Sequence, residues 1–217
     1  MRRIQKEDIT GLRDFITTIE AKIEEHGLDQ IFNVRKKFVG PLGEAKTLIK
    51  LYEELGDEYE YLWYGARRRD HDLVIRREST EKQVQIKTSS MENWAFSITV
   101  KGFDEAGVIR TQLRKGDFTL TNQIIEKDIK RRKVDFWVFL HEPYDTYYVF
   151  DNEGIIQSIE YDYHRYVNKI NIKGKAAKSK YAIVNNYVRS IQKKQYLAGR
   201  WEDFKENWNI IRDSFTA

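Results

Sequence analysis

The chain of 217 residues has no cysteine, only two prolines and only four histidines. Without cysteine it can form no disulfide bond, no zinc site built on thiolates and no cysteine nucleophile. The four histidines are scattered along the sequence, and none of them belongs to a paired metal-binding motif of the HExxH kind. These absences exclude enzymes that use a cysteine nucleophile, a zinc site built on thiolates or an HExxH metal site.

Long hydrophobic runs are also missing. No apolar stretch approaches the ~20 residues that a membrane helix needs, and the first residues contain no apolar segment of the secretory type. We therefore expect a soluble, cytoplasmic protein.

The length of the chain suits one domain. We take residues 1–217 as a single domain with a helical segment (1–40), a core (43–150) and a basic C-terminal region (165–217) packed on that core.

Acidic residues are absent from one long stretch of the chain. Between Arg165 and Arg200 there are ten of the 38 basic residues and no Asp or Glu, which leaves 28 basic against 34 acidic residues elsewhere. A basic stretch can simply be a solvated face. Its length and lack of acids favour a nucleic-acid surface, because neutralised phosphates release counterions and so drive binding. Four lysines lie there among glycine and small residues, and we expect them to contact DNA phosphates: Lys173, Lys175, Lys178 and Lys180.

Hydrophobic periodicity predicts an α/β protein. Apolar residues at helical spacing predict helices over 8–26, ended by Gly27, over 44–55, ended by Gly56, and over 122–132. Residues 38–43 are predicted to form a loop. Large apolar side chains between 201 and 215 predict a C-terminal helix that docks on the core. Strands are predicted over 59–64, 71–76, 83–88, 94–101, 108–113, 134–140 and 146–150. The nearly continuous apolar run at 134–140 is typical of a central strand covered on both faces.

Two of the predicted strands bring together groups that suit phosphodiester cleavage. This reaction needs a metal ion, a carboxylate to hold it and a cation near the attacking water. In the strand 83–88, Gln85 and Lys87 share one face because side chains alternate along a strand. Asp72 comes from the preceding strand of the same hairpin. An oxygen ligand, an ammonium group and a carboxylate would therefore meet at one point.

This pattern resembles the PD-(D/E)XK nuclease superfamily, which includes many type II restriction endonucleases and some Holliday-junction resolvases and homing endonucleases. The resemblance rests on His71-Asp72, twelve intervening residues and Gln85-Ile86-Lys87. A helix bearing Glu44 precedes this motif, and a helix and an apolar strand follow it, so residues 43–150 are covered. The resemblance implies a restriction-endonuclease-like core, an α/β fold with a mixed central sheet flanked by helices.

The resemblance also implies roles for individual residues. Asp72 would ligate Mg²⁺, and the Ile86 carbonyl and Gln85 would complete part of the shell. Lys87 would orient or activate water, and Glu44 would be the acidic residue of the preceding helix. Gln85 stands where the family usually has Asp or Glu, so the site would hold its metal less tightly or hold one ion rather than two.

The implied function is a homodimeric type II restriction endonuclease that hydrolyses double-stranded DNA with Mg²⁺. The alternative is a nucleic-acid-binding protein with a nuclease-like fold and no catalysis. Single residues also have simpler interpretations: Lys87 at a strand end could face solvent, and Glu44 in a first helical turn could serve the helix dipole. Asp70 and Glu81 are the substitutes if the register is shifted.

Overall fold

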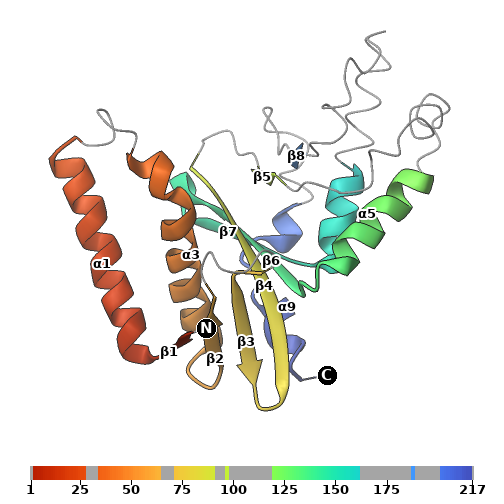
Figure 1. Cartoon of the computed structure of the whole chain (residues 1–217), viewed down its shortest axis with the longest axis horizontal. Coiled ribbons are helices and arrows are strands. Elements are labelled where there is room, and N and C mark those ends of the chain that lie inside the picture. Colours follow the sequence, from red (N-terminus) through yellow and green to blue (C-terminus); the bar gives the residue numbers. More distant parts are fainter. Residues whose placement is uncertain are drawn as a thin grey trace, which may run out of the picture.

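The computed structural model describes residues 2–27, 34–64, 71–90, 96–97, 119–161, 187–188 and 201–216. A six-stranded sheet forms the centre of the molecule (Figure 1). Its strands are β1 (Arg2–Ile4), β2 (Glu60–Trp63), β3 (Leu73–Arg77), β4 (Thr80–Ser89), β6 (Phe136–His141) and β7 (Thr146–Asp151). Two short strands, β5 (Phe96–Ser97) and β8 (Tyr187–Val188), pair separately. The helices are α1 (Lys6–Glu25), α3 (Val34–Leu55), α5 (Thr119–Arg131), residues 152–161 and α9 (Asn209–Asp213), with 3-10 turns η3 (Glu142–Tyr144) and η4 (Glu202–Phe204).

The sheet is mixed, with strand order β1-β2-β3-β4-β6-β7. β4 and β6 are parallel, whereas the other neighbours are antiparallel. A parallel pair needs a crossover connection, and the segment between these two strands contains α5. Helices α1 and α3 lie on one side of the sheet, and α5 and residues 152–161 on the other (Figure 1). The predicted α/β architecture with a mixed central sheet flanked by helices is confirmed.

The core forms where α3 packs on the sheet. Leu48 and Leu51 of α3 are buried in one cluster with alternate residues of the central strands, among them Val84 and Val138. Every residue of β6 is buried, because strands flank it on both sides and helices cover both faces. The prediction of a central strand over 134–140 is therefore confirmed, although the strand runs from Phe136 to His141.

Two predictions for the helical N-terminal region are wrong. Residues 38–43 are not a loop, because α3 runs without interruption from Val34 and contains Pro41. A proline removes one helical hydrogen bond, and the burial of the apolar face of α3 outweighs this loss. In α1, Phe15 belongs to the apolar residues at helical spacing that predicted this helix, which implied that it is buried, yet it is 57% exposed. The buried line is instead Ile9, Ile16 and Ile23, spaced at two helical turns.

The C-terminal segment docks on the core as predicted, but not as one helix. Trp201, Trp208 and Ile211 are buried. The helix is interrupted because Lys205 forms a β-bridge with Tyr148 at the edge of the sheet. The next residue, Glu206, adopts a left-handed conformation with φ +49°, so that η4 and α9 are separate short elements.

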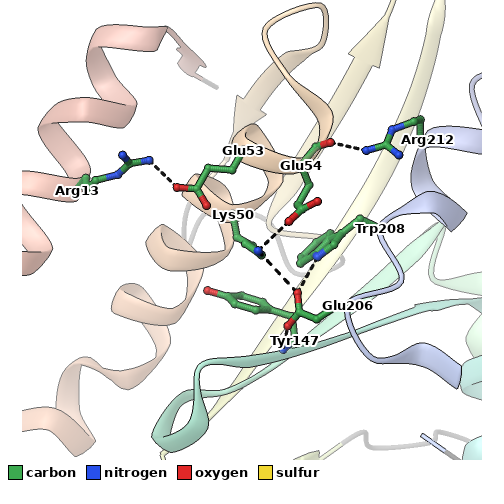
Figure 2. Close-up of polar contacts among 8 residues, drawn as sticks. All are labelled: Arg13, Lys50, Glu53, Glu54, Tyr147, Glu206, Trp208 and Arg212. Carbon is green, nitrogen blue, oxygen red and sulfur yellow. Dashed lines mark hydrogen bonds and ion pairs between the residues drawn. The ribbon is translucent and has the colours of Figure 1, made fainter. Parts of the chain in front are cut away.

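Figure 2 shows how this segment holds β7 and the end of α3. The Tyr147 amide donates a 2.9 Å hydrogen bond to Glu206 Oε1, and the Trp208 indole donates one of 2.9 Å to Oε2. Arg212 Nη2 donates to the Glu54 carbonyl of α3 at 2.5 Å. The last turns of α3 are therefore tied to the sheet edge through the C-terminal segment.

Of the predicted strand 94–101 the structure describes only Phe96–Ser97, and the predicted strand 108–113 lies outside the described residues. Strand β1 and the helix over 152–161 were not predicted. Among the described helices, none is long and apolar enough to span a membrane.

Candidate active site

The candidate site lies at a fork in the sheet, where β3 begins and β4 continues past it (Figure 1). Leu73, the first residue of β3, pairs with Val84. The Asp72 amide still donates to the Val84 carbonyl at 3.0 Å. From Val84 to Ser89, β4 pairs with β6 along its opposite edge. Among the described strands, none pairs with β4 on the β3 side beyond Val84, so this edge of β4 lies directly beside Asp72.

The Asp72 side chain covers the first part of that edge. Its Oδ2 accepts a 2.7 Å hydrogen bond from the Ile86 amide and a second from Gln85 Nε2. Asp72 is thus held through Oδ2, and none of the described residues donates a hydrogen bond to Oδ1.

Glu44 approaches the same fork from α3. Burial raises the pKa of its carboxyl group, and the negative charge of Asp72 raises it further. A hydrogen bond from Trp63 and the charge of Lys87 act in the opposite direction. Glu44 therefore lies near enough to Asp72 and Lys87 for their charges to act on its carboxyl group, although α3 and the strand hairpin are separate elements.

The helix-dipole interpretation of Glu44 is wrong, because α3 begins at Val34 and Glu44 lies well inside the helix. The dipole effect fades within the first turn. Inside the helix, a half-buried carboxylate near a second carboxylate has an electrostatic cost that the helix does not offset.

Asp72 carries the same kind of cost. Burial raises the pKa of its carboxyl group, and the Ile86 amide, Lys87, Gln85 and His71 lower it only in part. Two neighbouring carboxyl groups with raised pKa values are typical of a site that is completed by a cation.

Lys87 and Gln85 point to the same face of β4, as strand alternation predicts. Lys87 is half-buried and acts on both carboxyl groups, so it does not simply face solvent. Gln85 is 8% exposed, and its Nε2 also donates to the Ile86 carbonyl at 3.5 Å. Its amide nitrogen thus faces Asp72, where a carboxylate at position 85 would set two negative groups against each other.

The donor groups of the fork suit a hard divalent cation. Two carboxylates and one backbone carbonyl are oxygen ligands that Mg²⁺ prefers, and the Gln85 carboxamide would add an oxygen if it turned its nitrogen away from Asp72. Mg²⁺ is commonly held by one or two carboxylates while keeping several waters. No group of three or more His, Cys, Asp or Glu residues that could hold a metal occurs in the described ranges. Among the described acidic residues, Asp72 and Glu44 are the two that act on each other at the fork, and these are the carboxylates that could hold a cation there.

The chain matches no protein-family model and no curated protein. A bacterial homing endonuclease is similar in structure. Its sequence is 14% identical, the match covers 83% of this chain and 95% of that one, and the TM-score is 0.46.

The structure brings five predicted residues to one place: Glu44, Asp72, Gln85, Ile86 and Lys87. Glu81 lies elsewhere and accepts a 2.8 Å hydrogen bond from Arg76. Asp70 and the four lysines at 173, 175, 178 and 180 lie outside the described residues.

Trp63 was not predicted as part of the site. It ends β2, pairs with Leu73 and donates a hydrogen bond to Glu44. A tryptophan at a strand end gives no signal that it contacts a carboxylate on a helix.

Proposed function

We propose that the chain is a Mg²⁺-dependent endonuclease that hydrolyses phosphodiester bonds of double-stranded DNA. The observation that carries this proposal is the pairing of Glu44 and Asp72 at the fork. Each carboxyl group has a raised pKa, and the charge of Lys87 lowers both pKa values in part. The two groups come from different elements, α3 and the strand hairpin. Burying two carboxylates near each other lowers the stability of the folded protein. A bound divalent cation would relieve their repulsion, and this relief would favour its binding.

The residues of the fork have distinct roles in this proposal. Asp72 and Glu44 would hold Mg²⁺, with the Ile86 carbonyl and the Gln85 carboxamide oxygen as neutral ligands. When bound, Mg²⁺ supplies a positive charge that polarises the attacked phosphate. Lys87 would orient the attacking water and stabilise the charge that develops on the phosphate. Because the Ile86 amide already fixes Asp72, little reorganisation is needed at the moment of reaction.

The proposed enzyme is of the PD-(D/E)XK type with glutamine at the second acidic position, and it acts as a type II restriction endonuclease. Enzymes of this type cut both strands of a duplex with one active site in each of two subunits, so the proposed form is a homodimer. The basic stretch between 165 and 200 supports a DNA substrate, since it holds ten basic and no acidic residues. The four lysines at 173, 175, 178 and 180 would contact its phosphates.

Incubation of the protein with a mixture of duplex DNA sequences, with and without Mg²⁺, tests this function. The proposal predicts cleavage that requires Mg²⁺ or Mn²⁺. The basic stretch also fits a DNA-binding protein without catalysis. If the protein binds DNA with a steep salt dependence and cuts none of it with either metal, the binding function replaces the enzyme.

A further inference from the structure

Gly43 lies inside α3, where glycine is unfavourable. In a helix interior it costs roughly 0.5–1 kcal/mol relative to alanine. A Cβ atom at this position would lie 2.6 Å from both Cβ and Cγ2 of Thr88 on β4. Only glycine therefore lets α3 approach β4 this closely.

This contact directly adjoins the candidate site on both elements. Gly43 precedes Glu44 on α3, and Thr88 follows Lys87 on β4. The distance between helix and strand at this contact therefore determines how far Glu44 reaches toward Asp72 and Lys87.

We propose that the contact between Gly43 and Thr88 sets the separation of the Glu44 and Asp72 carboxylates, and thereby the size of the cation that the fork selects. Gly43 acts as a positioning residue, through Glu44. This inference rests on the proposed metal site and goes beyond it, because it concerns the choice between Mg²⁺ and larger cations.

A side chain at position 43 cannot be accommodated by a new rotamer of Thr88. The Thr88 Cβ is bonded to the backbone of β4, and Thr88 pairs with Leu140 of β6 in the middle of the sheet. The helix must move instead. Its last turns are held by Arg212, which donates to the Glu54 carbonyl (Figure 2). The displacement therefore falls on the part of α3 that bears Glu44.

A wider site should favour a larger ion. Mg²⁺ demands near-octahedral ligands at about 2.0–2.1 Å, whereas Ca²⁺ accepts ligands at about 2.3–2.6 Å in flexible arrangements. If Gly43→Ala moves Glu44 away from Asp72, we expect Mg²⁺ affinity to fall by about tenfold or more, in the range seen when groups supporting a metal ligand are changed. Ca²⁺ affinity should fall less, so that the ratio of the two affinities changes.

Calorimetric titration of the full-length protein with Mg²⁺ and with Ca²⁺ measures this ratio. The matched control is Gly40→Ala, also in α3, where an added Cβ meets nothing within 4 Å. Gly40→Ala should keep the wild-type ratio. In a Glu44→Gln background, Gly43→Ala should change neither affinity further, because its effect passes through the Glu44 carboxylate. Combining Gly43→Ala with Thr88→Gly, which removes the opposing Cβ, should restore the ratio.

An unchanged ratio in folded Gly43→Ala, or an equal change in the Glu44→Gln background, overturns the inference while leaving the metal site intact. A wild-type protein that binds neither cation overturns the proposed site as well. If Gly43→Ala does not fold, Thr88→Gly alone loosens the same contact without a clash. Thr88→Gly as a single substitution should then change the ratio of Mg²⁺ to Ca²⁺ affinity. Added to Glu44→Gln, it should leave the ratio of that variant unchanged, and any other result contradicts the inference.

Discussion

Replacing Glu44 by glutamine should make the metal-free protein more stable. The carboxylate is half-buried and lies near the negative charge of Asp72, and both effects raise its pKa. Glutamine has nearly the same shape, and its oxygen can still accept the hydrogen bond from Trp63. The substitution therefore removes a charge whose burial is unfavourable and keeps the packing.

The expected gain is on the order of 1 kcal/mol. Two like charges even ~10 Å apart repel by roughly 1.7 kcal/mol at an effective dielectric constant of about 20. Solvent screening of the half-buried Glu44 carboxylate and the loss of its attraction to Lys87 cancel part of this gain. For a protein of this size, about 1 kcal/mol corresponds to a rise of roughly 2–4 °C in Tm.

The gain should depend on pH. In the unfolded chain Glu44 ionises around its ordinary value of 4.5, whereas the folded protein retains the proton to higher pH. The ionised carboxylate therefore costs stability above this window and nothing below it. The advantage of Glu44→Gln should be small at about pH 4 and should grow as the pH rises through the raised pKa of Glu44.

Thermal denaturation in EDTA and in excess Mg²⁺ measures both effects. Wild type should gain about 2.7 kcal/mol when Mg²⁺ is present at 100 times its Kd, and Glu44→Gln should gain much less. Glu53→Gln is the matched control on the same helix: Glu53 pairs with Arg13 at 2.6 Å, so its loss should bring no gain in stability and no change in the response to Mg²⁺. If Glu44→Gln proves less stable than wild type in EDTA, Glu44 is a structural residue and the reasoning is refuted.

Three further predictions concern the rest of the site and the DNA surface. Lys87→Ala should reduce DNA cleavage by a factor on the order of 10² or more with folding and DNA affinity nearly unchanged, whereas Lys82→Ala on the same strand should not; equal turnover in kinetic assays of the two variants contradicts this role. Gln85→Glu should destabilise the metal-free protein, because it places a carboxylate against Asp72 Oδ2, and should strengthen Mg²⁺ binding; calorimetry showing weaker binding would exclude position 85 as a ligand. Neutralising the four lysines at 173, 175, 178 and 180 together should weaken binding to every DNA sequence and flatten the slope of log K against log salt by about 0.9 for each lost phosphate contact; an unaltered slope places the DNA surface elsewhere.

The strand part of the site could be predicted from the sequence because it depends on local geometry. Alternation along β4 puts Gln85 and Lys87 on one face, and a short hairpin brings Asp72 opposite Gln85 without a long loop. These relations follow from the period of a strand and the length of a turn. They need no knowledge of distant contacts.

For the helical part of the site, the sequence predicts that an acidic residue, Glu44, lies on a helix, but it does not predict how close Glu44 comes to Asp72. Glu44 was expected on a helix before the sheet, but its approach to Asp72 depends on the distance between α3 and β4. That distance is set by Gly43 and Thr88, which are far apart in the sequence. No local pattern marks such a pair.

Tertiary contacts also explain the errors in the fold. The C-terminal helix is interrupted at Glu206 because this residue forms two hydrogen bonds with the backbone of Tyr147 at the edge of β7. The Glu206 carboxylate accepts one from the Tyr147 amide, and the Glu206 amide donates the other to the Tyr147 carbonyl. Strand β1 has only three residues, too few for a recognisable alternation, and it forms because the edge of β2 is available to it. In both places an exposed sheet edge outweighs local preference.

In the proposed function, Asp72 holds the metal with which the protein cuts DNA. Cleavage of a mixed DNA library, measured against Mg²⁺ concentration, tests it most directly when wild type is compared with Asp72→Asn and Asp135→Asn. Both aspartates accept a 2.7 Å hydrogen bond from a β4 amide, Ile86 for Asp72 and Gln83 for Asp135, so the two changes disturb the strand alike. We predict Mg²⁺-dependent cleavage by wild type and Asp135→Asn, and none by folded Asp72→Asn. Equal cleavage by all three proteins, or equal losses in both variants, would contradict the account.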